Sequence, residues 1–357
     1  MGVGVAKGSE ASVKLKDVAK AAGVSQGTAS NVFSRPDVVR EEVRERVLKT
    51  AKELGYAGPS LTGRLLRAGK VNAIGVATVE PMKYFFEDPF ARALMAGIAE
   101  ACDANGAGLS LVSAGNPEKL AWNIQSALVD GFVLLCVDGG ERLVELTRER
   151  QLPFMALSLG TDDASIPALV VDNIGGAAAA ARHLVELGHR QIAVLSTEYS
   201  ERHYGRVTAA QADASLYSTS HDRITGYWQV LEAAGISRDA MAIFETRNNE
   251  ESVAACLEDL FANGPRPTAI LAMSDRIALI AMDWLQRRGI AVPGEVSIVG
   301  FDGVPEAAAS VPPLTTIAQP IAELGRRAVL AILNEGPQGR EMLPVELVVR
   351  GSTAAPS

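Results

Sequence analysis

Hydrophobic positions near the start of the chain recur every three or four residues, which is the spacing of one face of an α-helix. The first such face ends at Gly23, which permits the left-handed backbone conformation of a tight turn between helices. Ser25 follows and is a favourable N-cap for a second helix. The inward positions of these two predicted helices are Leu15, Val18, Ala19, Ala22, Ala29, Val32 and Phe33.

The outward positions of the second helix carry small or amide-bearing side chains, of the kind that reach base edges and phosphates in a DNA groove. These positions are Gln26, Gly27, Thr28, Ser30 and Asn31. The stretch predicts a helix-turn-helix whose second helix enters the major groove; an ordinary helical hairpin in a core is the alternative. After a loop at residues 34–37, a third helix starts near Arg40 to Glu42 and ends at Gly55, which closes a minimal core.

From Ala73 onward, short apolar runs alternate with helical stretches. Such continuous apolar strands between helices predict a parallel sheet covered on both faces. The pattern occurs twice, before and after residues 170–173, so we expect two doubly wound subdomains with a cleft between the carboxyl ends of their strands. The predicted strands are 73–78, 108–113, 132–137, 154–159, 191–196, 269–273 and 296–301. The predicted helices are 90–105, 118–128, 141–150, 175–187, 223–234, 250–262, 275–288 and 321–334.

Charge is distributed unevenly along the 357 residues, which are enough for two or three domains. Residues 1–70 hold 13 Lys and Arg against 7 Asp and Glu, a balance of +6. The net charge of the whole chain is −8, so the remainder carries −14. This asymmetry favours a basic nucleic-acid-binding module on an acidic body.

The sequence contains no residue pattern that indicates catalysis, a metal site or a cofactor site. Cys102, Cys136 and Cys256 lie far apart, which suits a reducing cytoplasm and predicts neither a disulfide framework nor a metal site. No glycine-rich phosphate loop follows the first strand, and the four His residues lack metal or triad spacing, so we expect no catalytic residues, no cofactor and no enzyme. Residues 1–12 predict a flexible tail rather than a signal peptide, and no apolar run is long enough to span a membrane.

Residues 15–56 resemble the headpiece of LacI-type transcription regulators, the lactose and purine repressor family. The resemblance rests on Leu15-Lys16-Asp17-Val18-Ala19, Gly23-Val24-Ser25 and Gly55-Tyr56. It implies operator DNA as the partner, with Gln26, Gly27 and Asn31 at base-reading positions. By the same resemblance Thr28 and Ser30 contact phosphates or the groove, and Ser25 caps the helix and lies near a phosphate. Because Gly27 has no side chain, base discrimination shifts to Gln26, Asn31 or the backbone.

Residues 58–70 resemble the hinge helix of the same family. That helix forms when two subunits lie side by side on DNA, and it inserts a Leu into the minor groove. Matching the family's pattern to Gly63-Arg64-Leu65-Leu66 makes Leu66 the inserting side chain, with Leu65 as the alternative. Gly63 weakens such a helix by about 1 kcal/mol relative to Ala.

The rest of the chain resembles the periplasmic-binding-protein-like effector domain of this family. The motifs that carry the resemblance are Asp172-Asn173, Leu187-Gly188-His189-Arg190, Ser274-Asp275, Val292-Pro293, Val299-Gly300-Phe301-Asp302-Gly303 and Pro312-Pro313-Leu314-Thr315-Thr316-Ile317. The resemblance implies a chain that crosses three times between two lobes. The expected domains are a headpiece at 13–57, a hinge at 58–70, an N-subdomain at 71–172 plus 303–319, a C-subdomain at 173–302 plus 320–351, and a tail at 352–357.

The resemblance also implies a small-molecule effector in the cleft, a sugar or a related metabolite. Arg223 at a helix start is expected to clamp the ligand, Asp302 at a strand tip to accept hydrogen bonds from it, and Gln319 to contact it at a crossover. Phe90 is a stacking face or a core residue, and Asp275 is a ligand contact or a helix cap. Ser158, where sugar-responsive members often carry Asp, is a further expected effector contact. The insertion at 197–222 either lines the mouth of the cleft or forms an unconstrained surface loop, and we expect the loop.

Together these features predict a transcriptional repressor whose operator affinity changes when an effector binds the open and closed cleft unequally. One headpiece touches too little DNA for specific binding, so we expect a homodimer on a pseudo-palindromic operator. The alternative is a solute-binding protein without enzymatic activity.

Overall fold

The computed structural model describes residues 13–56, 58, 70–135, 140–157, 163–200, 203–334 and 339–357. The chain divides into two compact units, Met1–Val71 and Asn72–Ser357. Among the described residues, no helix has both the length and the apolar character needed to cross a membrane.

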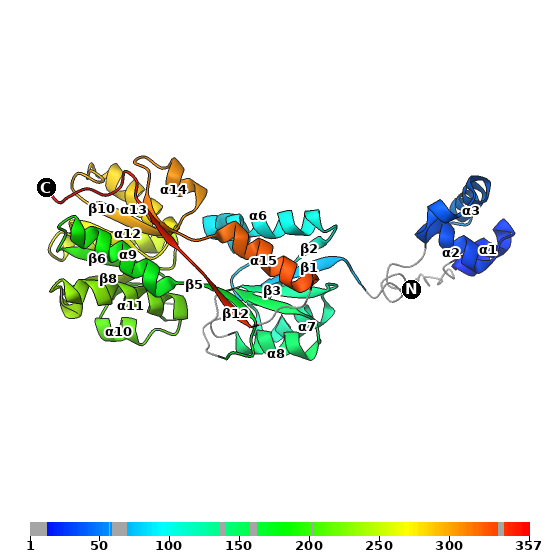
Figure 1. Ribbon diagram of the computed structural model, residues 1–357, viewed down its shortest axis with the longest axis horizontal. Helices are drawn as coiled ribbons and strands as arrows, with labels where there is room; N and C mark the ends of the chain where they lie inside the picture. Colours follow the sequence, from blue (N-terminus) through cyan, green and yellow to red (C-terminus); the bar gives the residue numbers. More distant parts are fainter. Residues whose placement is uncertain are drawn as a thin grey trace, which may run out of the picture. The chain divides into compact units, whose positions relative to one another are not determined.

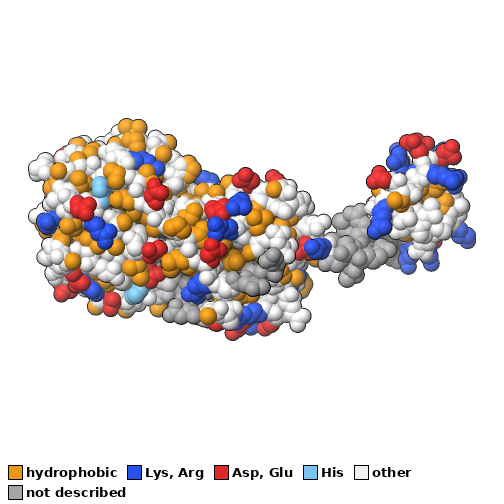
Figure 2. All heavy atoms as spheres, viewed as in Figure 1, with side chains coloured by type: hydrophobic (Ala, Val, Ile, Leu, Met, Phe, Trp, Pro, Cys, Tyr) orange, Lys and Arg blue, Asp and Glu red, His pale blue; other side chains and the backbone are white. Residues whose placement is uncertain are grey.

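The described part of the first unit, which we call the headpiece, contains three helices (Figure 1). They are α1 (Leu15–Ala22), α2 (Gln26–Ser34) and α3 (Glu41–Glu53), with a short 3₁₀ turn at Pro36–Val38. Gly23 has φ 66°, and Ser25 Oγ accepts the Thr28 N–H at 3.0 Å, so the turn and the cap form as the sequence predicts. Val18, Ala29 and Val47 are fully buried between the helices. The helix-turn-helix prediction is confirmed, and Lys and Arg side chains are spread over the visible headpiece surface (Figure 2).

Lobe 1 of the second unit is a six-stranded sheet of order β12-β5-β4-β3-β1-β2, in which every pair is parallel. Its strands are β1 (Ala73–Thr78), β2 (Gly108–Ser113), β3 (Gly131–Leu135), β4 (Phe154–Leu157), β5 (Ala168–Val171) and β12 (Arg340–Leu343). Its helices are α5 (Tyr84–Glu87), α6 (Pro89–Ala104), α7 (Pro117–Ser126), α8 (Glu141–Glu149) and α15 (Ile321–Leu333). Along β3, Val133 and Leu135 join the α6 and α15 core while Phe132 and Leu134 join the α7 and α8 core, so both faces are covered.

Lobe 2 is a seven-stranded sheet of order β13-β11-β10-β9-β6-β8-β7, parallel except at its two edges. Its strands are β6 (Ile192–Ser196), β7 (Gly205–Val207), β8 (Ala242–Glu245), β9 (Ala269–Ala272), β10 (Ser297–Asp302), β11 (Thr315–Ala318) and β13 (Glu346–Val348). Its helices are α9 (Asn173–Glu186), α10 (Ala209–Asp213), α11 (Ser218–Ala233), α12 (Glu250–Ala262), α13 (Asp275–Arg287) and α14 (Pro305–Ala309), with a 3₁₀ turn at Arg238–Ala240.

The predicted order of the returning segments is wrong. Strand β11 pairs in parallel with β10, so residues 303–318 stay in lobe 2 instead of rejoining lobe 1. Helix α15 and strand β12 return to lobe 1, where β12 pairs with β5, and β13 then goes back to lobe 2. The chain therefore crosses three times as expected, but it does so after β5, after β11 and after β12.

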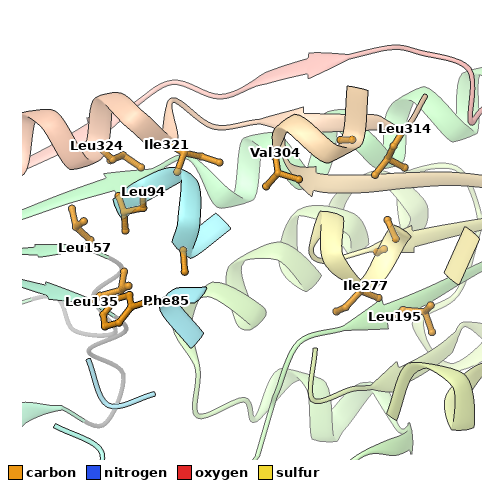
Figure 3. Packing of buried hydrophobic residues seen from close by; sticks show 14 of the residues in the cluster. Phe85, Leu94, Leu135, Leu157, Leu195, Ile277, Val304, Leu314, Ile321 and Leu324 are labelled. Carbon is orange, nitrogen blue, oxygen red and sulfur yellow. The ribbon is translucent and has the colours of Figure 1, made fainter. Parts of the chain in front are cut away.

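Glycines explain why α15 belongs to lobe 1. A Cβ on Gly97 of α6 would lie 2.2 Å from the Ala322 carbonyl oxygen, and one on Gly325 of α15 would lie 2.6 Å from the Leu94 carbonyl oxygen. The two helices therefore approach closely only because both positions are glycine. Figure 3 shows Leu94 beside Leu324 in the apolar layer that this approach creates.

Two further expectations are corrected. The C-terminal residues are not a free tail, because Ser352 is fully buried, its hydroxyl donates to the Ile298 carbonyl at 2.6 Å, and the ring of His189 contacts the Ala354 carbonyl at 2.8 Å. The described part of the insertion, 197–200 and 203–222, is not an unconstrained loop: β7 pairs with β8, and Tyr199 is 2% exposed. Both segments are held by hydrogen bonds to side chains far away in sequence, which local patterns do not reveal: the Tyr199 and Ser200 N–H groups donate to Glu245 Oε1, and the Ala354 N–H donates to Ser297 Oγ.

Candidate functional site

The outer face of α2 presents the predicted DNA-reading side chains. Gln26, Gly27 and Asn31 are exposed, and Thr28 and Ser30 are half-buried. The Ser25 and Thr28 hydroxyls share a hydrogen bond of 2.8 Å, so the cap is internally satisfied. The side chains of Gln26 and Asn31 make no hydrogen bond to other described residues, which leaves their amide groups available for a partner.

Gly27 is not required by packing. A Cβ built at this position would meet only Ser25 Oγ, at the ordinary contact distance of 3.7 Å. The glycine therefore leaves an open patch of helix surface beside Gln26. Packing in the headpiece does not explain that patch.

Two of the predicted site residues, Leu66 and Ser158, lie outside the described residues. Arg40 precedes α3 and makes no side-chain capping bond, so one helix-start donor lacks a side-chain cap.

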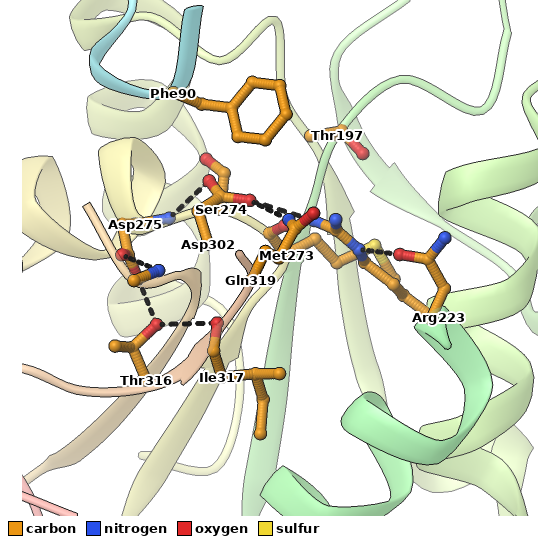
Figure 4. Close-up of polar contacts among 12 residues, drawn as sticks. Phe90, Thr197, Arg223, Met273, Ser274, Asp275, Asp302, Thr316, Ile317 and Gln319 are labelled. Atoms are coloured by element: carbon orange, nitrogen blue, oxygen red, sulfur yellow. Dashed lines mark hydrogen bonds and ion pairs between the residues drawn. The ribbon is translucent and has the colours of Figure 1, made fainter. Parts of the chain in front are cut away.

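A cavity of about 670 Å³ lies between the two lobes, within the range of small-molecule sites. Of the predicted effector residues, Phe90, Arg223, Asp302 and Gln319 line it. They come from α6, α11, the end of β10 and the crossover after β11, so elements far apart in sequence converge there (Figure 4). Further lining residues come from both lobes: Val79, Glu80, Pro81, Tyr84, Asp88, Val171, Asn173, Thr197, Glu198, Ser200, Tyr217, Thr219, Ser220, Arg247, Asn248, Ser274 and Arg276.

The floor of the cavity is built around Arg223, which is 5% exposed. Helix α11 starts at Ser218, so Arg223 lies in its second turn and not at a helix start as predicted. Its Nε donates to Asn173 Oδ1 at 3.0 Å, its Nη1 donates to the Met273 carbonyl, and its guanidinium stacks 3.7 Å from the centroid of the Phe301 ring. These contacts fix the plane of the guanidinium, which favours paired hydrogen bonds to a ligand.

Asp302 faces this arginine at the end of β10. Its Oδ1 lies 3.8 Å from Arg223 Nη1 and accepts the Gln319 side-chain amide at 2.8 Å. Asp302 has φ 139°, a conformation uncommon for a residue with a side chain, and the turn continues through Gly303 at φ 77°, where a Cβ would meet Ala318 Cα at 2.6 Å. The backbone turn thus places the carboxyl group at the cavity wall (Figure 4).

Burial controls the charge of this pair. It raises the pKa of Asp302 well above its ordinary value, while Arg223 opposes the rise and Asp275 adds to it. Burial also lowers the pKa of Arg223, against the attraction of Asp302. A ligand that donates hydrogen bonds to Asp302 would favour its ionised form, so occupancy and ionisation of the floor are coupled.

The expectation that Asp275 contacts the ligand is corrected. The residue is fully buried and is absent from the cavity lining, and its Oδ2 accepts the N–H groups of Gly303 at 2.7 Å and Val304 at 2.9 Å. Its other oxygen accepts the Thr316 hydroxyl (Figure 4). Ser274, not Asp275, caps α13 by accepting the Ile277 N–H. Asp275 therefore shapes the turn that presents Asp302.

Sequence reasoning missed several polar lining residues, among them Asn173, Asn248, Arg276 and Glu80. Each lies just after a strand or at the start of a helix, where carboxyl ends of parallel strands gather side chains at one edge. That position alone could have marked them. Their orientation depends on the closure of two lobes on each other, which the sequence does not show.

A helix-turn-helix headpiece joined to a two-lobed core with a polar cavity defines a ligand-responsive DNA-binding protein. Two family models match the chain: bacterial regulatory proteins, lacI family, at residues 14–58, and a periplasmic binding protein-like domain at residues 181–353. The HTH-type transcriptional regulator Rv3575c of Mycobacterium tuberculosis is 38% identical over 96% of this chain and 97% of its own length. The HTH-type transcriptional repressor CytR of Escherichia coli is 32% identical over 98% of this chain and 99% of its own length. The chain belongs to the LacI family of bacterial transcriptional regulators.

Solved structures agree with this assignment. The lac repressor dimer bound to operator and an anti-inducer is similar at a TM-score of 0.72 and 27% identity, covering 96% of this chain and 99% of that one. A complex of the regulator CelR with cellobiose is similar at 0.68 and 27%, covering 95% and 99%. Members of this family are regulators of transcription and not enzymes.

Proposed function

We propose that the protein is a homodimeric repressor that binds a pseudo-palindromic operator through α2 and releases or tightens its hold when a small effector enters the interlobe cavity. The observation that carries the proposal is the cavity floor, where Arg223 and Asp302 are held for paired polar contacts in a chain that also carries a helix-turn-helix. The lac repressor, similar over nearly the whole chain, is a dimer on its operator. We propose that the chain acts in the cytoplasm, where the operator is, and has no enzymatic activity.

The DNA-binding side chains follow from the exposed face of α2. We propose that Gln26 and Asn31 contact base edges and that Thr28 and Ser30 contact the groove or phosphates. Ser25 caps the helix and places its N-terminus near a DNA phosphate. Leu66 is proposed as the minor-groove side chain of the hinge.

The effector is proposed to be a polar ring compound, such as a sugar. Phe90 offers an aromatic face above the floor while Arg223, Asp302 and Gln319 offer donors and acceptors below it (Figure 4). The solved structure of CelR, which is similar in fold to this chain, is a complex with cellobiose. Ser158, outside the described residues, remains a proposed contact.

A mobility-shift titration with duplex DNA from upstream of the protein's own gene tests the proposal, with a scrambled duplex of the same composition as control. We expect a salt-dependent shift and at least a hundredfold preference for the genuine site. A thermal-shift screen with sugars, nucleosides and small acids then tests the cavity, because a ligand that binds the folded form raises the melting temperature. Ligand binding without any specific DNA binding would contradict the proposal and favour a solute-binding protein.

A further inference from the structure

The two lobes are joined by a polar contact at the edge of the cavity. It begins at Asp88, which lies between α5 and α6 of lobe 1 and is 2% exposed. Its Oδ1 accepts the N–H groups of Phe90 at 2.9 Å and Ala91 at 3.2 Å, so this oxygen caps α6. The cap also holds Phe90, the proposed stacking face, at the start of its helix.

The second oxygen of the same carboxylate reaches lobe 2. Asp88 Oδ2 accepts the side-chain amide of Asn248 at 3.0 Å and lies 3.5 Å from Arg276 Nη1. Asn248 in turn accepts the hydroxyl of Ser274 at 2.8 Å, and Ser274 caps α13. A continuous run of hydrogen bonds thus links the N-terminus of α6 in one lobe to that of α13 in the other, and all of its side chains line the cavity.

We propose that Asp88 is a positioning residue that holds the two lobes together beside the cavity, so that the closed arrangement presented to an effector depends on its carboxylate. Asp88, Asn248 and Arg276 are together called the interlobe junction. The inference rests on the proposed function only for its consequence, effector binding; the junction itself is formed by the chain's own residues.

The contacts of Asp88 are strong because its carboxylate is buried. A hydrogen bond to a buried charge is stronger than one in water, and removing the charge leaves its donors without a partner. Another ion pair also crosses between the lobes, Arg92 of α6 with Glu306 of α14, but both of its side chains are more than 40% exposed. Exposed pairs contribute little, so Arg92 is the matched comparison for Asp88.

Asparagine separates the two roles of Asp88. Asp88→Asn keeps an oxygen that caps α6, because Asn caps helices as well as Asp does, but it removes the charge that faces Arg276. Asp88→Ala loses both the cap and the junction. Arg276→Gln removes the cation from the other side, and Arg276→Lys keeps it.

The full-length protein carries one spin label on each lobe, at Lys119→Cys of α7 and Gln286→Cys of α13, both exposed positions. Cys102 and Cys256 are buried, and Cys136 is replaced by Ser. Pulsed electron resonance measures the distance between the labels without any effector, after mixing with an excess of unlabelled chain so that most dimers carry one labelled copy.

We expect one narrow distance population in the parent and in Arg276→Lys and Arg92→Gln. Asp88→Asn and Arg276→Gln should add a second, more open population, and the double variant should resemble either single variant, because both changes break the same contact. A parent-like distribution in Asp88→Asn would overturn the proposal, as would effects of the two single changes that simply add. Failure to find an operator or an effector would defeat the proposed function and leave this distance measurement standing.

Discussion

The two recognition surfaces of this chain are built in opposite ways. On α2, the groups proposed to read DNA are exposed, and Gln26 and Asn31 make no hydrogen bond to other described residues. In the cavity, Arg223 and Asp302 are buried and held by neighbours. The exposed surface gains its geometry from the helix beneath it, whereas the buried one gains it from a network of side chains.

This difference predicts that substitutions in the two regions affect the free energy of unfolding differently. A side chain on α2 can be altered with little effect on folding, so operator preference can vary independently of stability. A change in the cavity floor removes a ligand contact and also leaves a buried partner unsatisfied. Binding and stability should therefore separate in the headpiece and move together in the core.

The largest expected effect belongs to Arg223→Ala. Loss of the guanidinium leaves the Asp302 carboxyl buried without its cation, so we expect a loss of about 3 kcal/mol in unfolding free energy and about a hundredfold loss in effector affinity. Operator binding at low temperature should remain. Denaturant unfolding, calorimetry with the ligand found by the screen and mobility shift measure the three quantities.

Arg266→Ala is the matched control. Arg266 belongs to the same lobe and pairs with Glu295 at 2.9 Å, but its side chain is 53% exposed. It should change stability by less than about 0.5 kcal/mol. If Arg223→Ala responds to the effector as the parent does, Arg223 does not contact the effector.

The next effect is on the headpiece, through Gln26→Ala and Asn31→Ala. Each change removes an amide that can bond a base edge, which is worth about 1–3 kcal/mol of discrimination, so operator affinity should fall about tenfold or more. Stability should change by less than about 0.5 kcal/mol, because both side chains are exposed. Mobility shift on genuine and scrambled duplexes, with thermal melting, measures both. Equal loss on both duplexes would assign the amides to phosphates.

The headpiece could be predicted from the sequence more completely than the cavity could. The headpiece depends on local periodicity and on Gly23 and Ser25, so its helices could be predicted directly. The cavity floor was partly foreseen, because the family resemblance implied Arg223, Asp302 and Gln319 as ligand contacts and Asp302 ends an apolar strand. Asp275 has the same kind of position, yet its carboxylate turns into the space above Gly300, where a Cβ would meet it at 2.3 Å.

The lobe assignment failed for a related reason. Whether β11 extends the sheet of lobe 1 or of lobe 2 depends on its pairing with β10, and whether α15 packs on α6 depends on glycines more than 200 residues apart, at 97 and 325. Periodicity predicts that a strand or helix exists. It does not select a partner distant in sequence.

A smaller effect, on the pH dependence of stability, is expected from Glu198, which lines the cavity between the lobes. Burial raises the pKa of this carboxyl to about 7, and the nearby Glu80 and Glu245 add to the rise while Arg247 opposes it. The folded protein therefore holds a proton that the unfolded chain releases near pH 4.5, so this group lowers stability as pH rises from about 4.5 to 7. Above pH 7 the ionised form carries a constant cost.

Glu198→Gln removes this dependence. We expect the variant to be more stable than the parent at pH 8 by about 1 kcal/mol, allowing for the water that reaches the half-buried carboxyl, or about 2–4 °C in melting temperature. At pH 5 the two proteins should melt closer together. Melting curves between pH 5 and 8 measure the difference, with the exposed Glu258→Gln as control. Parallel curves for parent and variant would contradict a raised pKa at this position.

The smallest effect tests the open patch at Gly27. Because a Cβ there meets only Ser25 Oγ at 3.7 Å, Gly27→Ala should stabilise the headpiece by about 0.5 kcal/mol through helix propensity. If α2 lies against DNA at this patch, the added methyl group must displace the partner, and operator affinity should fall about threefold while stability rises. Glu45→Ala, an exposed change on α3, provides the control in which stability changes without the affinity loss. Unchanged operator affinity in Gly27→Ala would mean that DNA does not approach the helix at this residue, and the reading of bases would then rest on Gln26 and Asn31 at its flanks.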